Sequence, residues 1–322
     1  MLSEFDLIKR YFALHSATDE HVALGIGDDC ALLNITPGMQ MAISSDMLVS
    51  GRHFFPDADP YMLGHKCLAV NLSDLAAMGA KPIGFTLAFS LPEANPVWLE
   101  KFSHGLFTLA DQYHCRLIGG DTTKGPLNIC ITIFGELPPC TALRRDAAKV
   151  GDDIWVSGNL GDARLALAGY WRELELSETD QIQAAIRMHQ PTPRVALGMA
   201  LRGIAHAALD ISDGLVGDLG HILACSQVGA TLAVDEMPAG PVLQHFPLAL
   251  RRQFTLAGGD DYELCFTAPV TRRAEIIAAA ASVDTVVTRI GKIDAEPGVR
   301  FLDEQRNHVH LSLQSFDHFT SP

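Results

Sequence analysis

The segment Asn71-Leu72-Ser73-Asp74-Leu75-Ala76-Ala77-Met78-Gly79 ends a run of apolar residues with helical spacing that begins at Pro60. Gly79 and Pro82 are expected to stop this helix. Asn71 and Asp74 lie one turn apart on the same helix face, among leucines and alanines. A solvated face would more often carry Lys or Glu, so we expect Asp74 to point inward and to need a cation there.

Strand and helix patterns alternate on both sides of this helix. Upstream, the apolar spacing predicts a helix over 3–15, and residues 31–35 and 40–45 predict a hairpin. Downstream, the pattern predicts strands at 83–91 and 116–118 and helices at 96–114, 161–171, 193–203, 214–225 and 271–281. The predicted fold class is therefore α/β (α+β), with strands and helices interleaved.

The length of 322 residues suggests two domains, at about 150 residues for each. The pattern breaks at Pro138-Pro139 and again at Lys149-Val150-Gly151-Asp152, close to the middle of the chain. We therefore expect an N-terminal domain over 1–138 and a C-terminal domain over 139–322.

The chain is acidic, since 24 Lys and Arg against 38 Asp and Glu give a formal charge of −14. A nucleic-acid-binding protein needs a cationic face, so that class is disfavoured. No uncharged apolar run approaches the roughly 18 to 20 residues of a membrane span. Acidic residues stand where a signal peptide would be basic and then apolar, and the seven cysteines form no CxxC pair, which indicates reduced thiols. These features predict a cytoplasmic protein without nucleic-acid or membrane partners.

Aspartate stands beside Gly or Ser in six short segments. We expect five of them at a strand end or a turn, and Asn71 to Asp74 inside the helix described above. The six segments are Gly27-Asp28-Asp29, Ser44-Ser45-Asp46, Asn71-Leu72-Ser73-Asp74, Gly119-Gly120-Asp121, Asp210-Ile211-Ser212-Asp213-Gly214 and Gly258-Gly259-Asp260-Asp261. Magnesium takes carboxylate, hydroxyl and carbonyl oxygens, and needs only one or two carboxylates when phosphates supply the rest. Taken singly, each segment is explained more simply as a turn or a helix cap.

Common nucleotide-binding and catalytic motifs are missing. The segment Leu117-Ile118-Gly119-Gly120-Asp121 resembles a phosphate loop in outline, but the Walker pattern GxxxxGK[ST] is absent. The segment Gly25-Ile26-Gly27-Asp28-Asp29-Cys30 lacks the third glycine of the Rossmann fingerprint. The HEXXH, GxSxG and protein-kinase motifs do not occur either.

The acidic segments favour a chemistry that depends on divalent cations. A pair of unit charges at ~4 Å is worth about 4 kcal/mol at an effective dielectric near 20, so an aspartate-lined site would repel a polyanion unless metals intervene. Magnesium-assisted phosphoryl transfer from ATP meets this requirement. A non-enzymatic protein that binds divalent metals stays open as an alternative, although the EF-hand spacing is absent.

Five segments, in order and at suitable separations, resemble the thiamine-monophosphate kinase family of the PurM-like (aminoimidazole ribonucleotide synthetase) superfamily. They are Gly25-Ile26-Gly27-Asp28-Asp29-Cys30-Ala31, Asn71 to Gly79, Leu117-Ile118-Gly119-Gly120-Asp121-Thr122-Thr123, Asp210-Ile211-Ser212-Asp213-Gly214-Leu215 and Asp261-Tyr262-Glu263-Leu264. The resemblance runs from Phe5 to the carboxyl end.

The resemblance implies a phosphotransferase that uses ATP as co-substrate and several Mg²⁺ ions to convert thiamine monophosphate to thiamine diphosphate by direct in-line transfer. It also implies a PurM-like two-domain architecture. In that architecture the N-terminal sheet forms a barrel across a homodimer, the C-terminal domain is α+β, and active sites lie in clefts between domains.

The resemblance assigns roles by motif position. The implied metal ligands are Asp29, Ser44, Ser45, Asp46, Asp74, Asp121, Asp210 and Asp213. The implied ATP contacts are Tyr113, Gly120, Asp121, Arg145 and Ser212, and the implied thiamine monophosphate contacts are His53, Asp260 and Phe316. The implied catalytic set is Asp29, Asp74, Asp121 and Asp213.

Three positions depart from the family pattern. Ser45 stands in place of a Thr and keeps the hydroxyl, whereas Asp260 stands in place of a Glu and is one methylene shorter, which leaves Glu263 as the alternative contact. Phe316 replaces a Tyr or Trp and loses a polar group.

Without the resemblance, plainer roles suffice for several residues. Tyr113 and His53 would be packing residues, Arg145 part of a solvated arginine pair, and Phe316 an anchor for the last segment. Within the superfamily, a ligase or a selenophosphate synthetase is the rival. A selenophosphate synthetase needs a reactive Cys or Sec in an N-terminal glycine-rich loop, where this chain offers only Cys30.

Overall fold

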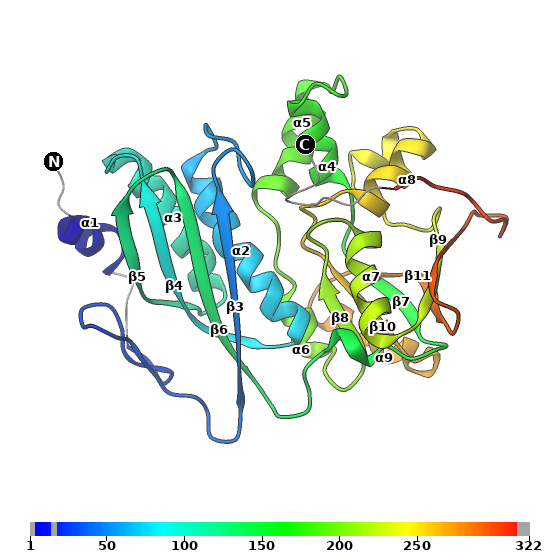
Figure 1. Ribbon diagram of the computed structural model, residues 1–322, viewed down its shortest axis with the longest axis horizontal. Helices are drawn as coiled ribbons and strands as arrows, with labels where there is room; N and C mark the ends of the chain where they lie inside the picture. The colour runs from blue at the N-terminus through cyan, green and yellow to red at the C-terminus, as the bar shows by residue number, and fades with distance from the viewer. Residues whose placement is uncertain (1–3, 14–17, 314–322) are drawn as a thin grey trace. The chain divides into compact units, whose positions relative to one another are not determined.

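The computed structural model describes residues 4–13 and 18–313, and its chain forms two compact units (Figure 1). One unit comprises the residues up to Leu75 together with Ala80–Cys140, and the other comprises Ala76–Gly79 and the residues from Thr141 onward. The domain boundary at 138/139 stays a prediction. Within the described ranges, no helix is both long and apolar enough to cross a bilayer.

The first unit is a four-stranded sheet with helices on one face (Figure 1). The strand order is β3 (Gln40–Val49), β6 (Asn128–Leu137), β4 (Lys81–Leu91), β5 (Arg116–Lys124). The β4–β5 pair is parallel and the other two pairs are antiparallel. The helices are α1 (Glu4–Tyr11), α2 (Pro60–Met78) and α3 (Pro96–Gln112), and the short strands β1 (Val22–Leu24) and β2 (Leu32–Leu33) pair with each other.

Alternation along the strands gives the sheet one buried face and one open face. Phe89 of β4 stacks on Phe102 of α3, with ring centroids 6.0 Å apart, on the helix-covered side. On the other side, Ile43, Met47 and Val49 of β3 are 60%, 54% and 36% exposed. In a single copy of the chain, the open face of the sheet thus exposes large apolar side chains.

Several predicted elements of this unit agree with the structure and one does not. The helix from Pro60 to Met78 is confirmed, and the expected helix over 3–15 is present as Glu4–Tyr11. The hairpin of 31–35 with 40–45 was wrong, because β2 pairs with β1 while all ten residues of β3 pair with β6. The ladder with β6 pairs ten residues of β3, so it satisfies more main-chain N–H and C=O groups than a short local hairpin would.

The second unit contains a six-stranded mixed sheet (Figure 1). The strand order is β12 (Gly298–Leu302), β9 (Gly229–Ala233), β11 (Val287–Asp294), β7 (Asp153–Ser157), β10 (Leu264–Ala268), β8 (Ala207–Asp210). Its α-helices are α4 (Asp162–Tyr170), α5 (Glu178–His189), α6 (Val195–Ala200), α7 (Leu215–Ser226), α8 (Leu248–Ala257) and α9 (Arg273–Ser282), and a 3₁₀ turn, η2, spans Arg145–Ala147. Helices α5 and α8 were not expected from the sequence.

Helices cover both faces of this sheet. Ile154 and Val156 of β7 belong to the core cluster that includes Leu215 and Leu219 of α7. On the opposite face, Arg273 of α9 forms an ion pair with the buried Asp153 of β7, with N and O 2.5 Å apart. The sheet is therefore packed on both sides, and its edge strand β8 leads through a short turn into α7.

Candidate active site

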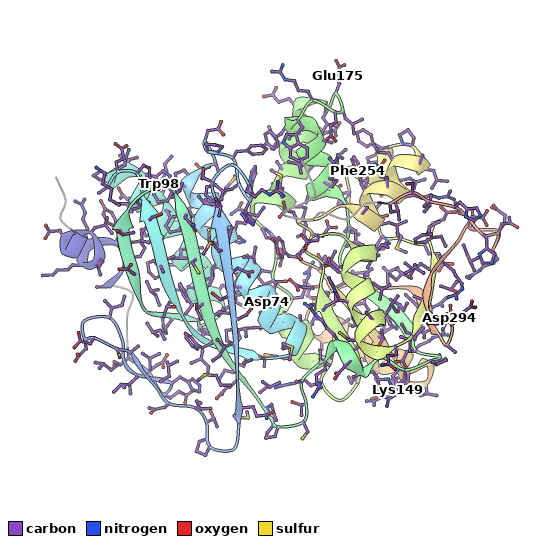
Figure 2. The ribbon with its side chains drawn as sticks, in the orientation of Figure 1. Asp74, Trp98, Lys149, Glu175, Phe254 and Asp294 are labelled. Atoms are coloured by element: carbon purple, nitrogen blue, oxygen red, sulfur yellow. The ribbon has the colours of Figure 1, made fainter. Side chains whose placement is uncertain are left out.

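Strand β3 and helix α2 bring four of the conspicuous polar residues of the first unit together. Ser44 Oγ donates a hydrogen bond to Asp74 Oδ2, and the main-chain N–H of Asp46 donates to Asn71 Oδ1 over 3.3 Å. Asn71 Nδ2 in turn donates to the carbonyl oxygen of Cys67 over 3.0 Å, which fixes the orientation of the amide. Asp74 is half-buried and points toward the sheet, as the sequence predicted (Figure 2).

Two carboxylates of this group are close enough to affect each other. Burial, and secondarily the negative charge of Asp74, raise the pKa of Asp46 to about 7. Like charges in a partly buried place are unfavourable unless a cation or a proton neutralises them. The donor set of two carboxylates, a hydroxyl and an amide oxygen suits Mg²⁺, which accepts oxygen ligands and would be completed by phosphates.

Ser45 does not join this group through its side chain. Successive residues of a strand point to opposite faces, so Ser45 lies on the open face while Ser44 and Asp46 face α2. Its hydroxyl lies 3.0 Å from Thr132 Oγ1 and donates to the carbonyl oxygen of Ile131 over 3.2 Å. A contact between Ser45 and the same cation would therefore use the main-chain oxygen.

The Gly119-Gly120-Asp121 segment lies inside β5 and not beyond its end, which corrects the expected strand of 116–118. Likewise, Ser44-Ser45-Asp46 lies in the middle of β3 and not at a strand end. Gly120 has φ +149, and a Cβ there would stand 1.8 Å from the carbonyl oxygen of Leu87, so only glycine fits.

The register places Asp46 and Gly120 on one row across the sheet, at opposite edges. Asp46 pairs with Ile131, Ile131 with Leu87, and Leu87 with Gly120. Three inter-strand spacings of about 4.8 Å separate β3 from β5 by about 14 Å. Asp121, which is exposed, directly follows Gly120 in β5. Asp121 and Asp46 therefore lie at opposite edges of the sheet and do not meet within one chain.

His53 lies in the turn that follows β3, and Asp29 in a loop between β1 and β2. His53 Nδ1 accepts the main-chain N–H of Val49 over 3.0 Å. In the neutral imidazole the proton is therefore on Nε2, which acts as a donor. Asp29 is exposed, and its main-chain N–H donates to Asp28 Oδ1 over 2.8 Å. Tyr113 caps the C-terminal end of α3.

In the second unit, two of the acidic segments pair with each other. Strand β8 ends at Asp210, which is 7% exposed, and the chain continues through Ser212 and Asp213 into α7. The main-chain N–H of Asp260 donates to the oxygen of Ser212, and that of Tyr262 to the oxygen of Ile211, both over 2.8 Å. The implied ATP contact Ser212 and the implied substrate contact Asp260 therefore lie on neighbouring segments.

The two acids that follow Asp260 serve the structure of the loop. Asp261 is 2% exposed and accepts the main-chain N–H of Gly161 over 2.8 Å. Burial raises the pKa of Asp261 well above its ordinary value. Glu263 is fully buried and accepts hydrogen bonds from Ser157 at 2.6 Å, Arg187 at 2.8 Å and Arg194 at 2.6 Å. The alternative assignment of Glu263 as a substrate contact was wrong, because its carboxylate is enclosed by these partners.

Arg145 is exposed at the start of η2. Ser226, the last residue of α7, donates to the carbonyl oxygen of Arg145 over 2.8 Å. The Arg145 backbone therefore lies beside the C-terminal end of α7, whereas Ser212 precedes the first residue of that helix. The structure does not bring the Arg145 backbone beside Ser212, and Phe316 lies outside the described residues.

Asp218 is an organising residue that the sequence reading missed. It lies in the first turn of α7, is 6% exposed, and Oδ2 accepts the main-chain N–H groups of Ser212, Asp213 and Gly214. Burial, opposed by these hydrogen bonds, raises the pKa of Asp218 to about 6. The available signal was an acid in the first helical turn after a glycine.

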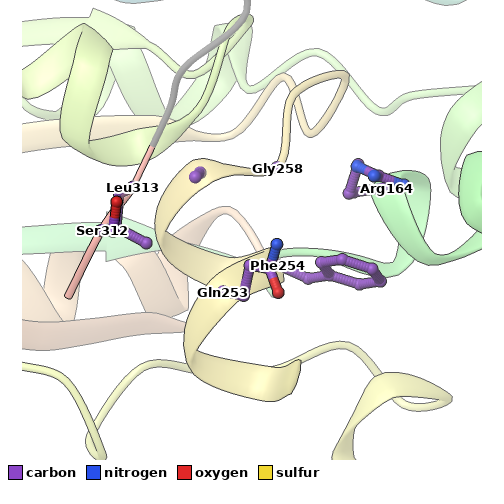
Figure 3. Close-up of a pocket in the computed structure, with 7 residues that line it drawn as sticks. Arg164, Gln253, Phe254, Gly258, Ser312 and Leu313 are labelled. Carbon is purple, nitrogen blue, oxygen red and sulfur yellow. The ribbon is translucent and has the colours of Figure 1, made fainter. Parts of the chain in front are cut away.

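A cavity of about 370 Å³ adjoins the loop that leads to Asp260 (Figure 3). Its lining residues are Arg164, Gln253, Phe254, Ala257, Gly258, Ser312 and Leu313. The guanidinium of Arg164 lies over the Phe254 ring, 4.7 Å from the centroid. Over the described part of the chain, no three His, Cys, Asp or Glu side chains gather in a way that would hold a metal unaided.

Comparison with known proteins gives a consistent result. The family described as AIR synthase related protein, N-terminal domain, matches residues 27–137, and its C-terminal domain matches residues 149–304. The thiamine-monophosphate kinase of Salmonella typhimurium is 46% identical over 322 residues, covering 99% of each chain.

Two solved structures are similar over most of their length. The crystal structure of thiamine-monophosphate kinase from Stenotrophomonas maltophilia K279a has a TM-score of 0.87 and 47% identity, covering 93% of this chain and 96% of that one. A structure named "AaThiL complexed with AMPPCP and TMP" has a TM-score of 0.76 and 28% identity, covering 89% of each chain. The predicted resemblance and the PurM-like two-domain α/β fold are thereby confirmed. This chain belongs to the thiamine-monophosphate kinase family, whose two domains are those of the AIR synthase related proteins.

Proposed function

We propose that this protein transfers the γ-phosphoryl group of ATP to the phosphate of thiamine monophosphate, which gives thiamine diphosphate and ADP. The observation that carries this proposal is full-length identity of 46% and 44% to two thiamine-monophosphate kinases. An acceptor phosphate oxygen attacks the γ-phosphorus as the bond to the bridging β–γ oxygen breaks, and ADP keeps that electron pair.

The acids of the site support a role in binding Mg²⁺ with ATP. Asp46 and Asp74, with Ser44, would hold Mg²⁺ in the first unit, and Asp210 and Asp213 would do so in the second. Asp29, Asp121 and the main-chain oxygen of Ser45 complete the proposed set of ligands. Bound Mg²⁺ supplies charge neutralisation and alignment of the phosphates. The ATP contacts we propose are Tyr113, Gly120, Asp121, Arg145 and Ser212.

The acceptor contacts we propose are His53, Asp260 and Phe316. His53 presents Nε2–H, since Nδ1 is occupied by Val49 N–H, and an N–H donor suits a phosphate oxygen. Asp260 follows Gly258, which lines the cavity beside α8 (Figure 3). We propose that this cavity receives the organic part of thiamine monophosphate. Asp29, Asp74, Asp121 and Asp213 remain the proposed catalytic set.

A homodimer is part of the proposal, because the first unit alone leaves its ligands apart. Asp46 on edge strand β3 and Asp121 on edge strand β5 are about 14 Å apart by strand spacing. In a barrel made of two copies, β3 of one copy would lie beside β5 of its partner and the open apolar face would be covered. The exposed Ile43 and Met47 support such a partner.

We also propose a cytoplasmic location. All seven cysteines are free, and unpaired thiols suit a reducing compartment.

The deciding experiment mixes the purified protein with ATP, Mg²⁺ and thiamine monophosphate and follows thiamine diphosphate and ADP by chromatography. Thiamine replaces the monophosphate in the control reaction. We expect equal amounts of both products with the monophosphate and no phosphorylation of thiamine. Binding of Mg²⁺ without any nucleotide-dependent product would instead support a metal-binding protein.

A further inference from the structure

The turn between β8 and α7 is held by one carboxylate oxygen. Asp218 Oδ2 accepts the main-chain N–H groups of Ser212 at 3.0 Å, Asp213 at 3.0 Å and Gly214 at 3.2 Å. The main-chain N–H of Asp218 itself donates to the carbonyl oxygen of Gly214 over 3.0 Å. Both the side chain and the backbone of Asp218, in the first turn of α7, thus form hydrogen bonds with the segment Ser212 to Gly214.

These three N–H groups lie in the turn between β8 and α7, outside the β-sheet hydrogen-bond pattern. A buried N–H that loses its acceptor incurs the full cost of desolvation, so the turn would rearrange if Asp218 were removed. Gly214 limits the alternatives, since its φ is +117 and a Cβ there would stand 2.8 Å from the carbonyl carbon of Ala257. The positive N-terminal end of α7 makes a negative side chain favourable at this place.

The same turn fixes a second segment. The carbonyl oxygen of Ser212 accepts the N–H of Asp260 over 2.8 Å, and that of Ile211 accepts the N–H of Tyr262 over 2.8 Å. Asp260 and Tyr262 both have positive φ values, 67° and 49°, a conformation that non-glycine residues adopt only when their surroundings impose it. Displacement of Ser212 would therefore displace Asp260.

We propose that Asp218 is a positioning residue for both substrates, because its carboxylate fixes the turn that carries Ser212 and Asp213 and, through Ser212, the backbone of Asp260. Ser212 and Asp213 are on the ATP and metal side of the proposed reaction, and Asp260 is on the acceptor side. Asp218 itself contacts main-chain groups of this turn. The inference rests on the proposed kinase function.

The test compares Asp218→Ala and Asp218→Asn with a matched control, Asp162→Asn. Asp162 is likewise a buried helix aspartate of the second unit, 3% exposed, and accepts the N–H groups of Val242 at 3.3 Å and Leu243 at 2.9 Å. Each variant is assayed for kcat, for KM of ATP and of thiamine monophosphate, for half-activation by Mg²⁺, and for its melting temperature.

We expect Asp218→Ala to lower kcat/KM for both substrates by about 10- to 100-fold and to raise the Mg²⁺ concentration for half-activation. Asp218→Asn keeps an oxygen acceptor at the same place and should recover most of the loss. Asp162→Asn should lower the melting temperature while both KM values stay within about twofold, because its contacts hold a different loop.

The inference is overturned if a folded Asp218→Ala protein keeps parental kinetics, or if Asp218→Asn is as impaired as Asp218→Ala, since charge and not position would then matter. Equal kinetic losses in Asp162→Asn would also overturn it. If Asp218→Ala does not fold, Asp218→Ser takes its place, because a serine hydroxyl is too short to accept all three N–H groups. Parental kinetics in a folded Asp218→Ser protein would then overturn the inference. An inactive parental protein would overturn the proposed function instead, and so the two failures are distinguishable.

Discussion

Ser44 and Asp74 are joined by a hydrogen bond from the hydroxyl of one to the carboxylate of the other, although 30 residues separate them in the chain. This bond connects strand β3 to helix α2 beside Asp46, whose pKa is raised by burial and, secondarily, by the negative charge of Asp74. The pair therefore joins the helix that carries Asp74 to the strand that carries Asp46.

Replacement of Asp74 by Asn should remove most turnover and leave the fold intact, because the amide keeps the size and loses the charge that faces the metal. Loss of a residue one step removed from a metal typically costs about 10- to 100-fold, so loss of a ligand should exceed about 100-fold in kcat. Steady-state kinetics and circular dichroism provide the measurement. Parental activity with unchanged Mg²⁺ dependence would reject the assignment of Asp74.

Mg²⁺ binding should weaken as the pH falls below 7. The pKa of Asp46 is raised to about 7 in the metal-free protein, so at lower pH a bound proton must leave before the carboxylate can bind a cation. Affinity should approach its full value about one unit above that pKa, and it should be about tenfold lower at pH 6 than at pH 8. Calorimetric titration at both pH values measures this, and Asp46→Asn should flatten the dependence. A parental affinity that is equal at both pH values would contradict the role of Asp46.

Replacement of His53 by Ala should raise KM for thiamine monophosphate by about tenfold, the value of one lost hydrogen bond to a charged group. KM for ATP should change much less, since His53 is assigned to the acceptor. Equal changes in both constants would show that His53 acts through the turn after β3. His53→Gln, which can still donate a hydrogen bond, is the matched control.

Replacement of Glu263 by Gln should lower the free energy of unfolding by about 3 kcal/mol, because two arginines would lose the carboxylate that pairs with them in a buried place. Glu263 is 0% exposed between Arg187 and Arg194, whose side chains are 23% and 17% exposed. Urea unfolding measures the change. The control is Glu275→Gln, whose partner Arg272 is in an exposed pair, and it should cost less than about 1 kcal/mol. A similar cost for both would show that burial of Glu263 is irrelevant.

The proposed homodimer predicts complementation between two inactive variants. Asp46→Asn and Asp121→Asn copies, co-expressed with different tags and purified as a mixed dimer, should regain about half of the parental activity, since one of the two sites would be intact. Either variant paired with itself should stay inactive. A mixed dimer without activity would indicate that each site takes Asp46 and Asp121 from the same copy, which contradicts the proposed arrangement. A monomer in light scattering would contradict the homodimer itself.

Local sequence was sufficient for several features. The helix of Pro60–Met78 and the inward face that carries Asn71 and Asp74 were predicted correctly, because apolar periodicity and glycine and proline breaks act over a few residues. The order of the acidic motifs also identified the family.

Features that depend on distant pairing were predicted poorly. The hairpin of 31–45 was wrong because β3 pairs with β6, almost 90 residues further along the chain. Strand alternation, and not composition, sends the side chain of Ser45 away from Ser44 and Asp46. Likewise, the run Asp260-Asp261-Tyr262-Glu263 contains three acids of similar appearance, yet the fold buries Asp261 and Glu263 and leaves Asp260 half-exposed.

The sequence by itself therefore determined which residues are acidic, that Asn71 and Asp74 share one face of α2, and which family the motifs indicate. These features depend on residue type and short-range spacing. Only the tertiary structure decided which acids are buried and hold main-chain N–H or guanidinium groups, and which lie nearer the surface. Whether a carboxylate is available depends on its burial and on the N–H or guanidinium groups that reach it. Those groups come from segments far away in the chain, as Asp218 and Glu263 show.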